Sequence, residues 1–186
     1  KITNISTGGT SNVIFTKENW NSYKSIVITG QNDNLSDGDQ SYKIELTADN
    51  STNDFRYKGR DPSDVELINL DDDTPGFFIS AVSNNTNEQG RKANFTISLR
   101  TQPIDNVTIN VESSDENEGT VDPALLVFDN ESWNSSKEVI ISGINDNISD
   151  GDQSYAIYLR SDNTTDDLSY RYLDPADVVL ENADDD

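Results

Sequence analysis

The 186-residue chain contains no cysteine, no histidine and no methionine. Without cysteine no disulfide can form, so the fold depends on packing or on another kind of cross-link. Without thiolate or imidazole ligands, a zinc or copper site is not expected. The same absences exclude a Ser–His–Asp or Cys–His catalytic arrangement and leave only paired carboxylates as hydrolytic chemistry. Since nothing in the sequence marks such a pair, we do not expect an enzyme.

Basic residues are scarce as well. The chain has 13 lysines and arginines against 35 acidic residues, a formal net charge of −22. This charge repels nucleic acid and anionic lipid, so neither is expected as a partner. Two interpretations remain, a solvated and salt-tolerant surface or a surface neutralised by bound cations. No apolar run approaches the roughly 18 residues of a membrane helix, and no membrane insertion is expected.

A long internal repeat organises the chain. Residues 15–73 align without a gap with residues 128–186 at a constant offset of 113, and 34 of the 59 aligned positions are identical. Residues 36–42 recur unchanged as residues 149–155, and both copies end in three aspartates. A period this long indicates a domain-sized module rather than one coil of a solenoid.

The two copies differ in completeness. We expect residues 74–186 to form a complete module and residues 1–73 to be the C-terminal part of another, with its opening strands missing. Such a part would expose a sheet edge and some of its core. The chain, which starts at Lys1 and stops at Asp186, is therefore interpreted as an excised part of a longer tandem array. The alternative is that a strand from elsewhere completes the first module.

Alternating apolar residues predict short β-strands. The pattern occurs at residues 95–99, 107–111, 139–141, 155–159 and 178–180, with further strands at 77–82 and 125–128. About seven short strands separated by Gly, Asn, Asp and Pro turns are typical of a sandwich. The predicted fold class is all-β, an antiparallel immunoglobulin-like β-sandwich in tandem modules. The single Trp of each copy, Trp20 or Trp133, is expected to anchor a core or a turn.

The acidic residues gather where strands end. Residues 32–39 and 145–152 are polar runs between predicted strands, and the aspartate triplets follow the last strand of each copy. Alternate loops of a sandwich meet at one end, so these carboxylates would repel one another unless a cation lay between them. Calcium accepts 6–8 oxygen ligands in irregular geometry and fits such loops best. An EF-hand starting at Asp33 fails, because Leu35 and Ile44 occupy ligand positions.

Several of these features together resemble the bacterial Calx-beta repeat. They are Glu88-Gln89-Gly90 before a strand, the loop from Asn145 to Tyr155, the Leu173-Asp174-Pro175 stretch and the final aspartate triplet. The resemblance implies a calcium-binding β-sandwich of the kind found in sodium–calcium exchangers, integrin β4 and large bacterial surface proteins. The loop departs from the exchanger pattern, with Asn where acids are common, which implies weaker or fewer sites.

The resemblance also implies the Ca2+ ligands. In the second copy they are Glu88, Asp115, Asp146, Asp150, Asp152, Asp184, Asp185 and Asp186. In the first copy the matching residues are Asp33, Asp37, Asp39, Asp71, Asp72 and Asp73, without counterparts for the early acids.

The implied role is a calcium-binding structural or adhesion module of a large bacterial extracellular or cell-surface repeat protein. Calcium would stiffen each module and its junction with neighbouring modules of the same chain, since the first triplet lies close to Pro75. A host or surface ligand is a further possible partner. The alternative is a carbohydrate- or protein-ligand-binding sandwich without a structural metal, in which Tyr57, Tyr170 and Tyr172 would stack on the ligand.

Overall fold

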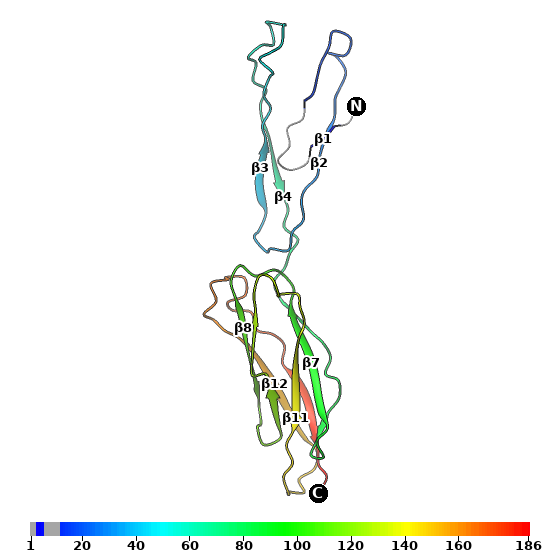
Figure 1. The fold of residues 1–186 in the computed structure, drawn as a ribbon, viewed down its shortest axis with the longest axis vertical. Helices are drawn as coiled ribbons and strands as arrows, with labels where there is room; N and C mark the ends of the chain where they lie inside the picture. The colour runs from blue at the N-terminus through cyan, green and yellow to red at the C-terminus, as the bar shows by residue number, and fades with distance from the viewer. Residues whose placement is uncertain (1–2, 6–11) are drawn as a thin grey trace. The chain divides into compact units, whose positions relative to one another are not determined.

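The structure is a computed structural model that describes residues 3–5 and 12–186. All regular elements of these residues are β-strands, and no helix among them has the length and apolar character needed to cross a bilayer. The chain separates into two compact units (Figure 1). Unit 1 comprises Lys1–Asp33 and Asp39–Leu70, and unit 2 comprises Asn34–Gly38 and Asp71–Asp186.

Unit 1 has two pairs of strands in its described part. β1 (Thr3–Ile5) pairs in parallel with β2 (Ile26–Ile28), with Thr3 opposite Ile26. β3 (Gln40–Ile44) pairs antiparallel with β4 (Val65–Asn69), with Tyr42 opposite Leu67. β2, β3 and β4 fall within the first copy of the repeat.

Unit 2 is a sandwich of two sheets. The five-stranded sheet has the order β10-β8-β12-β13-β6, and the four-stranded sheet has the order β5-β7-β11-β9. The strands of unit 2, in chain order, are β5 (Phe77–Ile79), β6 (Thr86–Asn87), β7 (Lys92–Leu99), β8 (Val107–Ser113), β9 (Gly119–Asp122), β10 (Leu125–Phe128), β11 (Lys137–Gly143), β12 (Gln153–Ser161) and β13 (Val178–Ala183).

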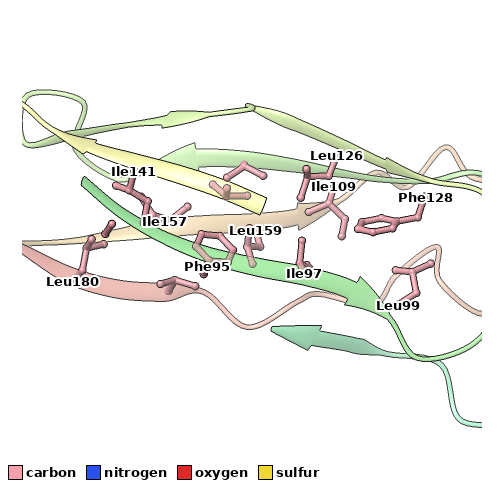
Figure 2. Packing of buried hydrophobic residues seen from close by; sticks show 14 of the residues in the cluster. Phe95, Ile97, Leu99, Ile109, Leu126, Phe128, Ile141, Ile157, Leu159 and Leu180 are labelled. Atoms are coloured by element: carbon pink, nitrogen blue, oxygen red, sulfur yellow. The ribbon is translucent and has the colours of Figure 1, made fainter. Parts of the chain in front are cut away.

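The core lies between the two sheets of unit 2. Strands β7 and β11, paired with Phe95 opposite Val139, direct alternate apolar side chains inward from one sheet. Strands β8 and β12, paired with Val111 opposite Leu159, do the same from the other. These side chains interdigitate in Figure 2. Alternation with period two thus explains both the strands and the layer between them.

The predicted all-β, immunoglobulin-like sandwich is confirmed, with three differences in detail. Within residues 71–186, all of which the structure describes, there are nine strands rather than about seven. The expected opening strand at residues 77–82 ends at Ile79, and the chain then changes sheets to form β6, which pairs in parallel with β13. β9, in the sequence Gly119–Asp122, lacks an apolar alternation and was not predicted.

The two tryptophans differ. Trp133 packs against the core of unit 2, and its carbonyl accepts a hydrogen bond of 2.9 Å from the Leu99 amide. It is therefore the anchor that the sequence predicted. Trp20 occupies the same place in the first copy and also lies in a turn, but it is 69% exposed and therefore anchors no core among the described residues.

Candidate metal centre

Four connections of unit 2 bring acidic residues to one end of the sandwich. Glu88 follows β6, residues 115–118 join β8 to β9, residues 144–152 join β11 to β12, and residues 184–186 follow β13. The β11–β12 connection lies beside the C terminus (Figure 1), where the Gly151 amide donates to Asp184 Oδ2 at 2.8 Å. Sheet topology, rather than sequence distance, assembles these groups.

Glu88, Asp184 and Asp186 lie closest together. Each offers one carboxylate oxygen, and these three oxygens are within 4.8 Å of one another. Glu88 is only 8% exposed, and its Oε2 atom accepts no hydrogen bond from any described residue. A buried carboxylate oxygen without a donor is costly, because it has lost water and gained nothing in return. A cation between the three oxygens would satisfy it.

The electrostatics of Glu88 agree with its geometry. Burial raises the pKa of Glu88 above its usual value of 4.5. The Asp185 side chain raises this pKa further, the Asp185 amide lowers it, and the negative charges of Asp184 and Asp146 raise it again. Without a cation, the negative charge of Glu88 is therefore less favourable here than on a free carboxyl group.

Glu118 joins this end of the sandwich although the sequence did not single it out. It is partly buried, and its Oε2 atom accepts a hydrogen bond of 3.3 Å from Asn182 Nδ2. Burial raises its pKa and the Asn182 contact lowers it, while the charges of Asp150, Asp115 and Asp146 raise it. In the sequence, Glu118 could have been found from its position three residues after Asp115 and directly before Gly119. In the structure these residues form a turn, in which the Gly119 amide donates to the Asp115 carbonyl at 3.0 Å.

The other predicted ligands of the second copy surround the triad. Asp152 Oδ1 accepts from the Asp184 amide at 3.1 Å, and Asp146 Oδ1 accepts from the Ile148 amide at 2.8 Å. Asp115 Oδ1 accepts from the Asn117 amide at 3.0 Å. Asp150 faces Glu118, and Asp185 faces Glu88, closely enough for each to influence its neighbour's pKa. All eight predicted residues thus lie at this end of the sandwich. Three of them, Glu88, Asp184 and Asp186, have carboxylate oxygens within 4.8 Å of one another.

A buried amide fixes the loop that carries several of these acids. Asn182 is 1% exposed and donates from Nδ2 to the Ile144 carbonyl at 2.9 Å. The backbone of Gly143 passes so close that an added Cβ would meet Asn182 Oδ1 and, at 2.7 Å, the Asn87 carbonyl. Glycine is required at this position because of the close approach.

The first copy reproduces part of this arrangement. Asp71 Oδ2 accepts from the Gly38 amide at 2.7 Å, and Asp71 Oδ1 accepts from the Asp73 amide at 2.9 Å, as Asp184 does with Gly151 and Asp186. The position matching Glu88 falls before residue 1. Of the remaining candidates, Asp33 and Asp39 belong to unit 1, and Asp37 and Asp72 to unit 2. A shared site of these first-copy residues stays a prediction.

Three comparisons place the chain among known proteins. No family model matches it, and no curated protein matches it significantly. Two Caenorhabditis elegans proteins of the MSP-domain type, SSP-19 and WR4, align with 57% of this chain and with 100% and 97% of their own chains, at 13% identity and TM-scores of 0.35 and 0.36. Domains 4 and 5 of the S-layer protein SbsC align with 65% of this chain and 52% of their own, at 13% identity and a TM-score of 0.31. Similarities at this level assign no function.

The chemistry of the ligand atoms determines which cation this site can bind. The acidic side chains at this end offer only oxygen atoms as metal ligands. Asn145 adds an amide group, whose Nδ2 atom already donates a hydrogen bond to the Glu88 carbonyl at 3.2 Å. Hard cations prefer such oxygens, and calcium tolerates the irregular geometry of converging loops better than magnesium does. The residues present therefore fit a calcium ion.

Proposed function

We propose that unit 2 is a calcium-binding structural module of a bacterial extracellular or cell-surface repeat protein of Calx-beta type. The observation that carries the proposal is the buried Glu88 carboxylate: its Oε2 atom lacks a donor, and one of its oxygens lies within 4.8 Å of a carboxylate oxygen of both Asp184 and Asp186. The residue pattern that resembles Calx-beta repeats supports the same function. The proposed role is mechanical rather than catalytic.

Calcium would act by cross-linking two strands that are far apart in the sequence and pair over only two residues each, Thr86 with Asn182 and Asn87 with Ala183. The triad belongs to the start of the module, after β6, and to its last residues, after β13. An ion held by both ends opposes their separation and cancels the repulsion between their carboxylates. Binding to the folded state alone stabilises it by about 2.7 kcal/mol when free calcium is 100-fold above its dissociation constant. Extracellular modules typically bind calcium with dissociation constants of about 10⁻⁴–10⁻³ M, which suits a surface location.

The test compares Glu88→Gln with the unmodified chain in calcium titration calorimetry and in thermal unfolding with calcium, magnesium or chelator. The unmodified chain is expected to bind calcium and to unfold at a higher temperature with it. Glu88→Gln is expected to lose most of this gain but to unfold at a higher temperature than the unmodified chain in chelator, because it removes a buried negative charge. These two opposite changes separate a ligand from a merely structural residue.

Glu131→Gln is the matched control, since Glu131 lies in the β10–β11 turn at the other end of the sandwich. It removes the same charge and should leave both the calcium response and the chelator melt unchanged. Unfolding that is the same with calcium and with chelator in the unmodified chain would contradict the proposal.

A groove favours a second candidate, a ligand-binding module. It has a volume of about 440 Å³ and lies along β5 between Phe78, Arg100 and residues 173–176. Phe78 is exposed, with the Arg100 guanidinium 5.0 Å from its ring centre. Of the tyrosines considered for stacking, however, Tyr170 is fully buried, and its hydroxyl contacts Thr101 Oγ1 at 2.8 Å. Tyr170 is thus a packing residue. Binding on a glycan array that is lost in Phe78→Ala would favour this candidate.

A further inference from the structure

The outer face of the five-stranded sheet carries apolar side chains where a solvated sheet normally carries polar ones. Alternate residues of β12 and β13 are buried, and the residues between them face outward. Arg160 and Glu181 belong to this outward face. Between them lie Ala156, which is paired with Val179 across the two strands, and Tyr158, the next outward residue of β12. We call Ala156, Tyr158 and Val179 the outer patch.

The side chains of the outer patch are open to solvent. Val179 is 68% exposed, Tyr158 is 36% exposed, and Ala156 is partly exposed. The Arg160 guanidinium lies over the Tyr158 ring, 4.8 Å from its centre. Tyr158 is thus held by a neighbour in the same strand and still leaves a third of its surface exposed. Adjacent exposed apolar side chains within a polar surround are typical of interaction sites.

The first copy of the repeat shows that the fold does not require these apolar residues. Its aligned residues are Lys43, Glu45 and Glu66. β3 and β4 still pair, with Lys43 opposite Glu66, and Lys43 Nζ lies 3.1 Å from Glu45 Oε1. By contrast, the first copy repeats without change the inward residues of β12 and β13, which are Tyr155, Ile157, Leu159, Val178 and Leu180. The apolar character of the outer patch is therefore not needed for strand pairing.

Uncompensated negative charge lies beside the outer patch. Glu112 lies opposite Tyr158 on β8, and Glu181 belongs to the outward face of β13. Both glutamates are exposed, and neither forms an ion pair with any described residue. Arg160, the nearest cation of this face, is already paired with Asp177 at 3.1 Å. Electrostatic complementarity therefore favours a partner that brings positive charge to the edge of the patch.

The same charges disfavour other occupants. A two-fold contact between two copies of this chain would bring the glutamates of both patches together, and each chain has a formal net charge of −22. Nucleic acid and anionic lipid are repelled for the same reason. A polypeptide with apolar side chains between lysines or arginines fits both the patch and its surround.

We propose that the outer patch is a docking surface for another protein, whose contact region has apolar side chains at its centre and lysines or arginines at its edges. The apolar side chains cover Tyr158 and Val179, and the cations pair with Glu112 and Glu181. Removal of apolar surface from water supplies affinity, and the charges set the orientation of the partner. The contact uses the strands β12 and β13 and none of the three carboxylates of the metal centre.

The experiment titrates the full chain with two synthetic peptides of equal length and charge, with calcium present throughout. One peptide alternates lysine and leucine, so that an extended strand of it has one apolar face, and the other alternates lysine and serine. The lysine–leucine peptide is expected to bind about tenfold more tightly, because only it buries apolar surface. Amide NMR signals of residues 154–160 and 178–181 should shift. Equal affinity for both peptides, or shifts confined to the acidic loops, would overturn the proposal.

Tyr158→Glu combined with Val179→Glu places the residue types of the first copy in the outer patch. This double variant should lose the preference for the lysine–leucine peptide, although it adds two negative charges. Charge alone predicts the opposite, tighter binding of both peptides, and that result would contradict the proposal.

Ile140→Glu combined with Leu168→Glu is the matched control. It adds the same charge at exposed apolar residues outside the patch, which are 36% and 73% exposed. The control should keep the preference for the lysine–leucine peptide. Sedimentation of the unmodified chain as a dimer that Tyr158→Glu with Val179→Glu does not form would overturn the proposal, because the patch would then bind a second copy.

Discussion

The two copies of the repeat, residues 15–73 and residues 128–186, share their local hydrogen bonds and differ in burial. Asp64 Oδ1 accepts from the Leu46 amide at 3.0 Å, and its counterpart Asp177 accepts from the Leu159 amide at the same distance. Asn69 Nδ2 donates to the Gln31 carbonyl at 2.7 Å, and Asn182 makes the equivalent bond at 2.9 Å. Leu46 is nevertheless half-buried, whereas Leu159 is fully buried.

This difference shows which part of the fold is encoded locally. Turns, caps and hairpin contacts depend on residues near one another in the repeat, and they form in both copies. The hydrophobic core depends on β7 and β8, which lie far away in sequence, and it forms only where they are present. Hydrophobic burial supplies the larger share of folding free energy, so the two copies should respond very differently to the same substitution.

The largest expected contrast is between Phe128→Ala and Phe15→Ala. Phe128 is fully buried in the core of unit 2, so its removal should destabilise unit 2 by about 3–5 kcal/mol through lost burial and the resulting cavity. Phe15 is exposed, so the same change there should alter stability by no more than about 0.5 kcal/mol. Urea unfolding, monitored by circular dichroism, measures both. Similar losses in the two variants would show that unit 1 already has a covered core.

A smaller contrast concerns pH and depends on Glu88, which has no counterpart in the first copy. Its folded-state pKa is raised above 4.5, so without calcium the folded state holds a proton that the unfolded state releases. The stability of unit 2 should therefore fall as the pH rises from 4.5 through the raised value, and recover as the pH is lowered again. Calcium should remove this loss at neutral pH, since it takes the place of the proton.

Thermal melts at a series of pH values, in chelator and in calcium, check this expectation. Glu88→Gln should flatten the part of the chelator profile that Glu88 causes and leave the part caused by Glu118, whose pKa is also raised. A chelator profile that is unchanged by Glu88→Gln would contradict the assignment.

The sequence predicted strands β11, β12 and β13 well, because their inward residues alternate without interruption. Val139 and Ile141, or Tyr155 and Ile157, define one face by period alone. Strand β6 could not be predicted in this way, because it has only the residues Thr86 and Asn87 and depends on pairing with β13. β9 similarly depends on β11, with Val121 opposite Ile141. Short strands of polar residues form because a neighbour supplies the hydrogen bonds.

The sequence predicted the type of residue at the candidate site, but not which of the acidic residues lie close enough together to bind one ion. Acidic loops at strand ends predicted that these acids gather at one end of the sandwich. Eight acids were predicted there, and three of them have carboxylate oxygens within 4.8 Å of one another. Burial distinguishes them, and burial of Glu88 follows from its position directly after β6, whose partner β13 leads to Asp184. Glu118 was missed because its burial depends on Asn182, 64 positions away in the sequence.

The smallest expected effect is one that the two copies of the repeat should share. Arg160 Nη1 lies 3.1 Å from Asp177 Oδ1, and the aligned hairpin of unit 1 has Lys43 Nζ at 3.1 Å from Asp64 Oδ2. The side chains of both pairs are substantially exposed, so Arg160→Gln and Lys43→Gln should each destabilise their hairpin by about 0–1 kcal/mol, and less in high salt. Urea unfolding at low and high salt measures this. A loss of stability in Arg160→Gln several times that in Lys43→Gln would mean that the surface contacts, like the core, depend on β7 and β8.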